Sequence, residues 1–407
     1  MSRISDEKLF ALLIGMPSIY LYLSGLAQLI SICTILKNLV YPLAYLLGIT
    51  ALIRTINKRN NFLFIIMTTI PVFLTIIINK NIVKYLIDTQ SIQGILTSDL
   101  VNLYLVAFPS FFIAKNIKDS NLLFKELYQI GKIIVSLFCI TFFLIVFIYR
   151  LTFDYMNITY GVIPWLFFIC GFSICYKKRI TLLLSGISIF FILISGCRGA
   201  AIITLIFMIL LYLSSLFNNF TIKKLILFIF LIVIGIIVLI NFDSIISTLY
   251  YSLKGIGFNS RTLELYLGQG YEKTLNHYSD RAVLQIPLIK QFNLIGHGIY
   301  SDRLILGGVY AHNLFVEWIY DFGLFIGSLL SIYFIWNVLS KCWIVFRTDI
   351  MSLKIILASC ISVILCKYMV SSSYLHAPEF WYLLGLIINK KMYFDNILKR
   401  ENLKERD

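Results

Sequence analysis

The stretch ITYGVIPWLFFICGFSICY, residues 158–176, contains no charged side chain. An α-helix rises about 1.5 Å per residue, so a stretch of this length matches the roughly 30 Å hydrocarbon core of a bilayer. Its apolar residues are continuous rather than alternating, which argues against a membrane β-strand. This stretch therefore predicts a transmembrane helix.

Comparable stretches recur along the whole chain. The sequence has 407 residues, of which 59% are hydrophobic and 14% are charged, and its mean hydropathy is +0.88. A single soluble core of this size could not bury so much apolar surface. The sequence predicts an all-α, polytopic integral membrane protein with about 12 transmembrane helices, at residues 9–32, 38–55, 61–79, 98–115, 129–149, 158–176, 180–196, 199–216, 225–242, 314–340, 351–371 and 377–390.

The distribution of Lys and Arg predicts the orientation of these helices. With both ends in the cytoplasm, the short external connections hold five basic residues, Lys37, Lys80, Lys84, Arg150 and Arg198, whereas the internal segments and the tail are much richer. This asymmetry follows the positive-inside rule. The formal charge of +15 is then explained by topology and by attraction to anionic lipids. Nothing points to nucleic acid as a partner.

The predicted spans divide the chain into four parts. Residues 1–242 hold helices one to nine, 243–311 form one long external loop, 312–390 hold the last three helices, and 391–407 form a basic cytoplasmic tail. A long loop in a bundle of otherwise short connections usually carries function. The eight cysteines have no metal-type pairing such as CxxC, and we interpret them as small buried hydrophobes.

Three polar residues fall on the same predicted face of the membrane. Arg198 lies at a tight external turn, Arg281 lies in the long loop, and His312 opens the helix that returns into the membrane. Each also has a purely structural interpretation. Arg198 could extend to lipid headgroups, Arg281 could be a solvated charge, and His312 with Asn313 could start a helix.

Further polar residues accompany them. At about 100° per residue, Glu317 and Asp321 lie roughly 140° and 180° around the helix from His312. We therefore expect them to pair with cations of the loop or of a neighbouring helix rather than with that histidine. Lys367 lies inside a predicted span, where a charge usually marks function, although near the external end it could reach the interface.

A metal site is the weaker interpretation of the external histidines. None of them has the close helical spacing of a zinc motif. We therefore expect no metal and no cofactor at the external residues His277, His297, His312, His376, Asp280 and Asp302.

Three motifs in order resemble the O-antigen polymerase and O-antigen ligase superfamily. They are SGCRGA at 195–200, SDRAVLQIPLIKQFNLIGHGIY at 279–300 and AHNLFVEWIYDFGLFIG at 311–327. The resemblance implies transfer of glycans from a polyprenyl-diphosphate carrier at the periplasmic face. It also implies that Arg198 and Arg281 bind the diphosphate and that His312 is the catalytic residue.

The residue types suit this chemistry. A diphosphate leaves as a stable anion, and guanidinium groups bind phosphate oxygens in a bidentate fashion. The attacking sugar hydroxyl gains from a base near neutrality, which histidine supplies. Two arginines and one histidine on one membrane face form a minimum set for metal-independent glycosyl transfer.

The resemblance favours an O-antigen polymerase of the bacterial inner (plasma) membrane, with its active site facing the periplasm. The expected partners are undecaprenyl-diphosphate-linked oligosaccharide repeat units and membrane lipids, with a chain-length regulator as a further candidate. Residues expected to bind substrate are Arg261, Arg303, Asn313, Glu317 and Lys367.

Two alternatives remain open. An O-antigen ligase would join the glycan to lipid A-core, but Ile326 stands where the ligase pattern has Gly, Thr or Tyr. A lipid-linked oligosaccharide flippase would also have about twelve spans. Transporters often have repeated halves and polar or broken helices, whereas this sequence shows no clear internal repeat.

Overall fold

The computed structural model describes residues 4–56, 59–86, 98–149, 155–195, 197–218, 240–255, 267, 283–370, 372–375 and 377–393, with scattered residues between 221 and 237. In these ranges the regular elements are helices and no strand occurs. In chain order they are α1 (Asp6–Leu26), α2 (Ser31–Thr55), α3 (Arg59–Ile78), η1 (Lys80–Ile82), α4 (Val83–Leu86), α6 (Asp99–Asn102), η2 (Leu103–Ala107), α7 (Phe108–Asn116), α8 (Ser120–Phe142), η3 (Phe143–Ile148), α9 (Tyr155–Cys175), α10 (Arg179–Ser195), α11 (Arg198–Asn218), α13 (Phe242–Gly255), α15 (Asp302–Ile305), α16 (Leu314–Phe346), α17 (Met351–Val370) and α18 (Pro378–Ile388).

Seven apolar helices within the described residues are long enough to cross a membrane. They are Asp6–Leu26, Ser31–Thr55, Asn60–Ile78, Ser120–Ile148, Asn157–Cys175, Leu314–Phe346 and Met351–Met369. The prediction of an all-helical, multi-pass membrane protein is therefore confirmed. Three shorter apolar helices cover Arg179–Ser195, Ile202–Leu216 and Pro378–Ile388.

The number of twelve spans and the long external loop stay predictions. The span expected at 98–115 corresponds to α6, η2 and α7 together. Half of the span expected at 225–242 lies outside the described residues, as do residues 256–266 and 268–282 of the expected loop and the tail beyond 393.

Helix ends differ from the expected limits where hydropathy carries no signal. The turn between α1 and α2 occupies residues 27–30, inside a stretch that hydropathy assigned to the first span. Helix α8 begins at Ser120, well before the expected 129, because the Asp119 carboxylate caps it by accepting from the amides of Asn121 (2.9 Å) and Leu122 (3.0 Å). Such caps determine where a helix begins.

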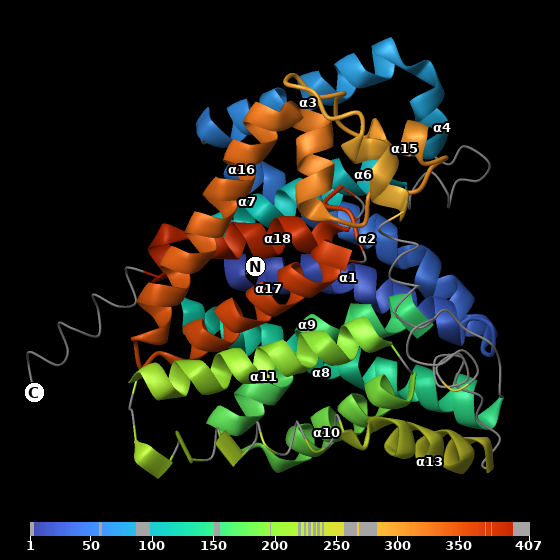
Figure 1. Cartoon of the computed structure of the whole chain (residues 1–407), viewed down its shortest axis with the longest axis vertical. Helices are drawn as coiled ribbons and strands as arrows, with labels where there is room; N and C mark the ends of the chain where they lie inside the picture. Colours follow the sequence, from blue (N-terminus) through green and yellow to red (C-terminus); the bar gives the residue numbers. More distant parts are fainter. Residues whose placement is uncertain are drawn as a thin grey trace, which may run out of the picture.

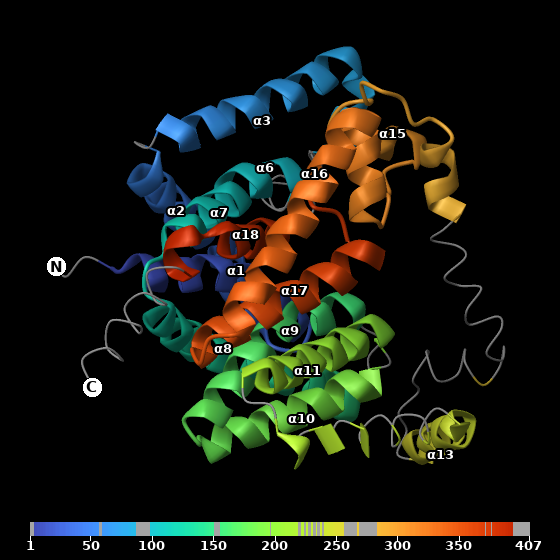
Figure 2. The same ribbon diagram turned by 60° about the vertical axis from the view of Figure 1, so that its left-hand side comes forward.

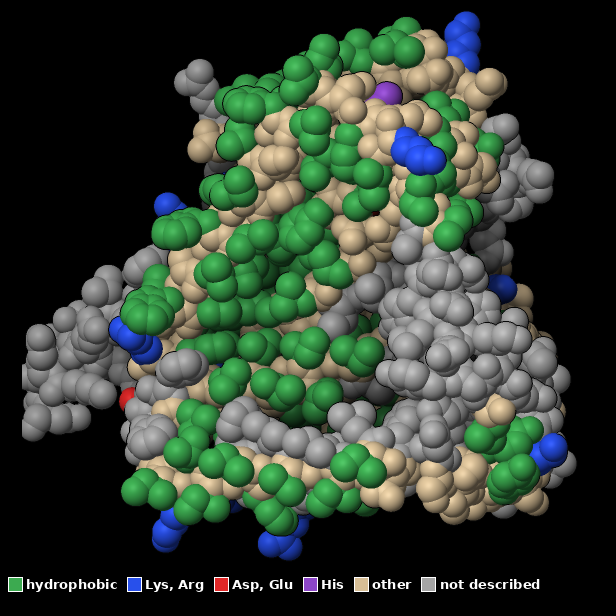
Figure 3. Space-filling view, viewed as in Figure 1, with side chains coloured by type: hydrophobic (Ala, Val, Ile, Leu, Met, Phe, Trp, Pro, Cys, Tyr) green, Lys and Arg blue, Asp and Glu red, His purple; other side chains and the backbone are tan. Residues whose placement is uncertain are grey.

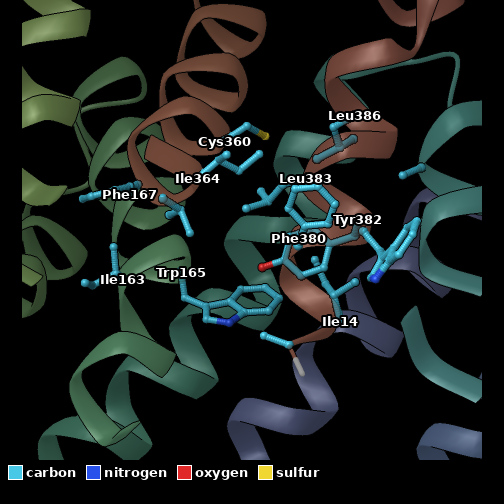
Figure 4. Close-up of a cluster of buried hydrophobic side chains, with 14 of the residues drawn as sticks. Ile14, Ile163, Trp165, Phe167, Cys360, Ile364, Phe380, Tyr382, Leu383 and Leu386 are labelled. Carbon is cyan, nitrogen blue, oxygen red and sulfur yellow. The ribbon is translucent and has the colours of Figure 1, made fainter. Parts of the chain in front are cut away.

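The bundle is packed around α1, α9, α17 and α18. Figure 4 shows Ile14, Trp165, Ile364, Phe380 and Tyr382 converging in its interior. The Trp165 indole nitrogen donates to Ser18 Oγ at 3.1 Å, which satisfies its one polar group inside the apolar core.

Close helix approach depends on glycine. A Cβ atom added at Gly48 of α2 would lie 1.8 Å from the Leu105 carbonyl oxygen, which belongs to the π-helical turn η2. Small residues at helix contacts are typical of membrane bundles, because close backbone packing replaces the hydrophobic effect there. Substitution of Gly48 would therefore separate α2 from η2.

The arrangement places several helix ends near one another. Figures 1 and 2 show α15 beside α3, α4 and the start of α16, with α16 running obliquely from there across the bundle. On the face seen in Figure 3, hydrophobic side chains cover the middle and most Lys and Arg lie near the margins. This distribution suits a protein surrounded by lipid.

Candidate functional site

His312 lies just before Asn313, the N-cap of α16, in an uncommon backbone conformation. Its φ is +55°, in the left-handed region that few non-glycine residues adopt. Its ring lies 4.3 Å from the ring of Tyr310, centroid to centroid, and the side chain is half-buried. Residues held in such conformations cluster at functional sites, where the surrounding structure fixes them.

Asn313 is the N-cap of α16. Its side-chain oxygen accepts from the amides of Phe315 (3.1 Å) and Val316 (3.2 Å). The cap satisfies amides that the first helical turn leaves open. Substrate binding by Asn313 stays a prediction, and in the structure its side-chain oxygen caps the helix start.

A buried ion network lies behind this helix start. Arg303 Nη1 is 2.7 Å from Asp302 Oδ1 and 2.9 Å from Glu317 Oε1. The exposed fractions of these side chains are 2% for Arg303 and 0% for both acids. Charges so deeply buried are tolerated only when they are paired and hydrogen-bonded.

The α17–α18 connection and two aromatic rings complete this network. Arg303 Nη2 donates to Ser373 Oγ at 3.0 Å, and the Ser373 hydroxyl in turn donates to Glu317. The guanidinium carbon lies 5.1 Å and 5.6 Å from the ring centroids of Tyr300 and Tyr310, within cation–π range. Burial lowers the pKa of Arg303, but Asp302 and Glu317 outweigh it and raise the pKa above its ordinary value.

The network is joined to the histidine through the main chain. Asp302 Oδ2 accepts from the amide of Ala311 at 3.1 Å. On the other side of His312, the Glu317 amide donates to the Asn313 carbonyl at 2.9 Å. Both neighbours of His312 are thus tied to residues of the ion network.

Helix α16 is broken at Gly323, six residues after Glu317. Gly323 has φ +83° and ψ 165°, a combination essentially limited to glycine. Residues 293–298, here called the strap, lie against the break. The Leu324 amide donates to the Asn293 carbonyl at 2.8 Å, and the Tyr320 and Asp321 carbonyls accept from the amides of His297 and Gly298, both at 3.0 Å.

The strap satisfies the backbone groups that the break releases. An open amide or carbonyl in a lipid environment costs several kcal/mol, so a broken membrane helix needs such partners. The His297 ring stacks on Tyr320 at 4.4 Å and 17°, and its Nε2 lies 2.7 Å from the Gln291 carbonyl oxygen. His297 therefore has a structural role in the strap.

A second polar cluster joins α9, α11, α17 and α18. Lys367 pairs with Glu379, and the Lys367 ammonium lies 5.8 Å from the Tyr160 ring centroid. A Cβ at Gly199 would lie 1.8 Å from the Tyr160 hydroxyl, so the first turn of α11 meets the same cluster. Since Ser373 lies between Lys367 and Glu379 in the chain, the α17–α18 connection links this cluster to the ion network.

The structure brings some of the predicted site residues together. The backbone of Arg198 begins α11 near the Lys367–Glu379 pair, but its side chain lies outside the described residues, as do Arg261 and Arg281. The expectation that Glu317 pairs with a loop cation is confirmed by Arg303. Asp321 was expected to pair with a cation as well, whereas its Oδ2 accepts from the Tyr374 hydroxyl at 2.7 Å.

Three residues of these clusters were not predicted from the sequence. They are Asp302, which pairs with Arg303, Ser373, which also bonds Arg303, and Glu379, which pairs with Lys367. A signal existed for Glu379, because a lysine inside a span needs a counter-ion and Glu379 is the next acid along the chain. Ser373 carried no signal, since one serine among many polar loop residues is unremarkable until the fold brings it to Arg303.

No family model matches this sequence, and searches of curated proteins and of solved structures find no match either. Among the described residues, no group of three or more His, Cys, Asp and Glu side chains could hold a metal ion. The case for function therefore depends on the geometry of the helix ends and on the chemistry of their side chains.

Proposed function

We propose that the protein is a membrane glycosyltransferase of the O-antigen polymerase type, acting on undecaprenyl-diphosphate-linked repeat units at the periplasmic face of the inner membrane. His312 is the base that takes the proton of the acceptor hydroxyl. The observation that carries the proposal is the half-buried His312 in a left-handed backbone conformation, held between the capped start of α16 and a fully buried ion network. A general base must be both accessible and fixed in place.

The cationic residues supply the other half of the chemistry. The diphosphate gains negative charge as the glycosidic bond breaks, and guanidinium groups stabilise that charge. Arg198 is suited to this task because it begins α11 beside the cluster of Lys367, Glu379 and Tyr160. Arg281 is proposed as a further phosphate ligand on the resemblance of the surrounding motif alone, and Arg261 as a substrate-binding residue.

The decisive experiment uses purified protein in liposomes with a polyprenyl-diphosphate-linked repeat unit and measures polymer formed over time. His312→Gln keeps a hydrogen-bonding side chain but cannot accept the proton, so the rate should fall by about 10² to 10⁴-fold. His297→Gln is the matched control: its amide can still donate to the Gln291 carbonyl, and most of the rate should remain. A wild-type rate in the His312 variant would refute the proposed base.

Polymerase and ligase are separated by deleting the gene and resolving the surface glycan on a gel. A core bearing a single repeat unit indicates that a polymerase was lost. A bare core, with long polymer retained on the lipid carrier, indicates that a ligase was lost and would replace the polymerase proposal.

The break in α16 favours a second candidate, a lipid-linked oligosaccharide flippase. Broken helices with buried charges are typical of transporters, and Gly323, Glu317 and Asp321 provide both features. The same deletion decides between them, because loss of a flippase leaves the lipid-linked unit in the cytoplasmic leaflet.

A further inference from the structure

We propose that Asp302, Arg303 and Glu317 form a positioning triad for His312 and are not ligands of the lipid-linked donor. This inference rests on the proposed function and deepens it, since it replaces direct substrate binding by Arg303 and Glu317 with support of the base.

The bonding of Arg303 argues against phosphate binding. Its Nη1 lies against both carboxylates and its Nη2 against Ser373, while only 2% of its side chain is exposed. A phosphate would have to displace a carboxylate and expel the packed rings of Tyr300 and Tyr310. Two acids beside the guanidinium would also repel that phosphate.

The connection to His312 is short on both sides. Asp302 accepts from the Ala311 amide at 3.1 Å, which fixes the Tyr310–Ala311 peptide just before His312. Glu317 lies in the first turn of α16, where its amide is bonded to the Asn313 carbonyl, so its bond to Arg303 fixes the helix start that follows His312. Arg303 bridges the two acids and thereby fixes the histidine's backbone from both directions.

The left-handed backbone of His312 explains why such a clamp is needed. A non-glycine residue in this region costs about 1–3 kcal/mol and persists only where its surroundings enforce it. Without the triad, the chain at His312 would relax toward an ordinary conformation and turn the imidazole away. A displacement of about 1 Å at a reacting group can cost about 10²-fold in rate.

The test is a double-mutant cycle on purified, reconstituted protein, with rates measured at limiting and saturating lipid-linked donor. Asp302→Asn should lower kcat by about 10²-fold and leave the KM for the donor unchanged. In a His312→Ala background the same substitution should cause no further loss, because a positioning residue has nothing left to position. Asp6→Asn, at the remote Arg54–Asp6 pair (3.0 Å), is the control and should leave the rate unchanged.

Folding is controlled with a second variant. Breaking a buried pair typically costs about 3–5 kcal/mol, so each variant is first checked by melting temperature and gel filtration. If Asp302→Asn does not fold, Arg303→Lys carries the test, since lysine keeps a cation between the carboxylates but cannot bridge them with a planar fork. The same loss of kcat, absent in the His312→Ala background, is expected.

A measurement that does not depend on turnover separates the positioning triad from the proposed glycosyltransferase function. Diethyl pyrocarbonate modifies accessible imidazoles, and mass spectrometry reports each histidine separately. In the Asp302→Asn or Arg303→Lys protein, modification should become faster at His312 and stay unchanged at His297.

Three outcomes would overturn the triad while leaving His312 as the base: equal losses in both backgrounds, a raised donor KM with unchanged kcat, or an unchanged modification rate at His312. Full activity of His312→Ala would remove the proposed function itself, and the triad with it.

Discussion

At the scale of single residues, Arg198 gives the most specific prediction about how the diphosphate of the lipid-linked donor is bound. It begins α11 beside Gly199, which meets the Tyr160 hydroxyl. Arg198→Ala should abolish polymer while the protein persists in the membrane, and Arg198→Lys should rescue poorly because an ammonium cannot bind phosphate in bidentate fashion. Polymer is measured on gels and protein by immunoblot. Arg54→Ala, at the remote pair with Asp6, is the control, and full activity of Arg198→Ala would exclude a phosphate contact.

The site could be predicted in part at this scale. The sequence predicted a cation partner for Glu317, because an acid within a span needs one, and Arg303 is that partner; the role of His312 as a base stays a prediction. The sequence did not predict the bonds of Arg303 to Asp302 and Ser373, because residues 302, 317 and 373 come together only in the folded chain. Contacts between residues so distant in the chain leave no local pattern.

At the scale of elements, the broken helix α16 makes a direct prediction. Gly323→Ala introduces a side chain at φ +83°, and its Cβ would lie 2.3 Å from the Leu294 carbonyl oxygen. We expect a loss of at least about 1–3 kcal/mol, seen as a lower melting temperature in detergent, together with loss of activity. Gly186→Ala in α10 is the matched control, because nothing lies within 4 Å of its Cβ. Equal melting temperatures for the two variants would show that the strap does not depend on Gly323.

Elements were predicted well where hydrophobicity determines them. Uncharged stretches such as 158–176 became helices, here α9. The break in α16 was not predicted, because DFGLFIG is as apolar as the helix around it. The break depends on the strap, which lies more than twenty residues upstream. The strap supplies hydrogen-bond partners for the backbone groups at the break, which would otherwise be unpaired in lipid.

At the scale of the whole molecule, the orientation in the membrane is testable. Val309 is 40% exposed in the segment before His312, and Lys178 is exposed at the start of α10. In a variant without its native cysteines, Val309→Cys should react with a membrane-impermeant maleimide added to intact spheroplasts, and Lys178→Cys should react only after lysis. The reverse pattern would place His312 in the cytoplasm, where lipid-linked polymerisation is not expected.

Helix α3 adds a dependence on the surrounding lipid. Only 17% of its apolar span is buried within the protein, against 83% for the span in α9, so α3 is held mainly by hydrocarbon. Yet Thr75 of α3 packs against Gly298, and Tyr85 of α4, which follows α3, packs against Gly308. In a thinner or thicker bilayer α3 would tilt to match the hydrocarbon, and the tilt would be transmitted to both ends of the segment that precedes His312. Membrane thickness would thereby act on the site as an effector does, without binding to it.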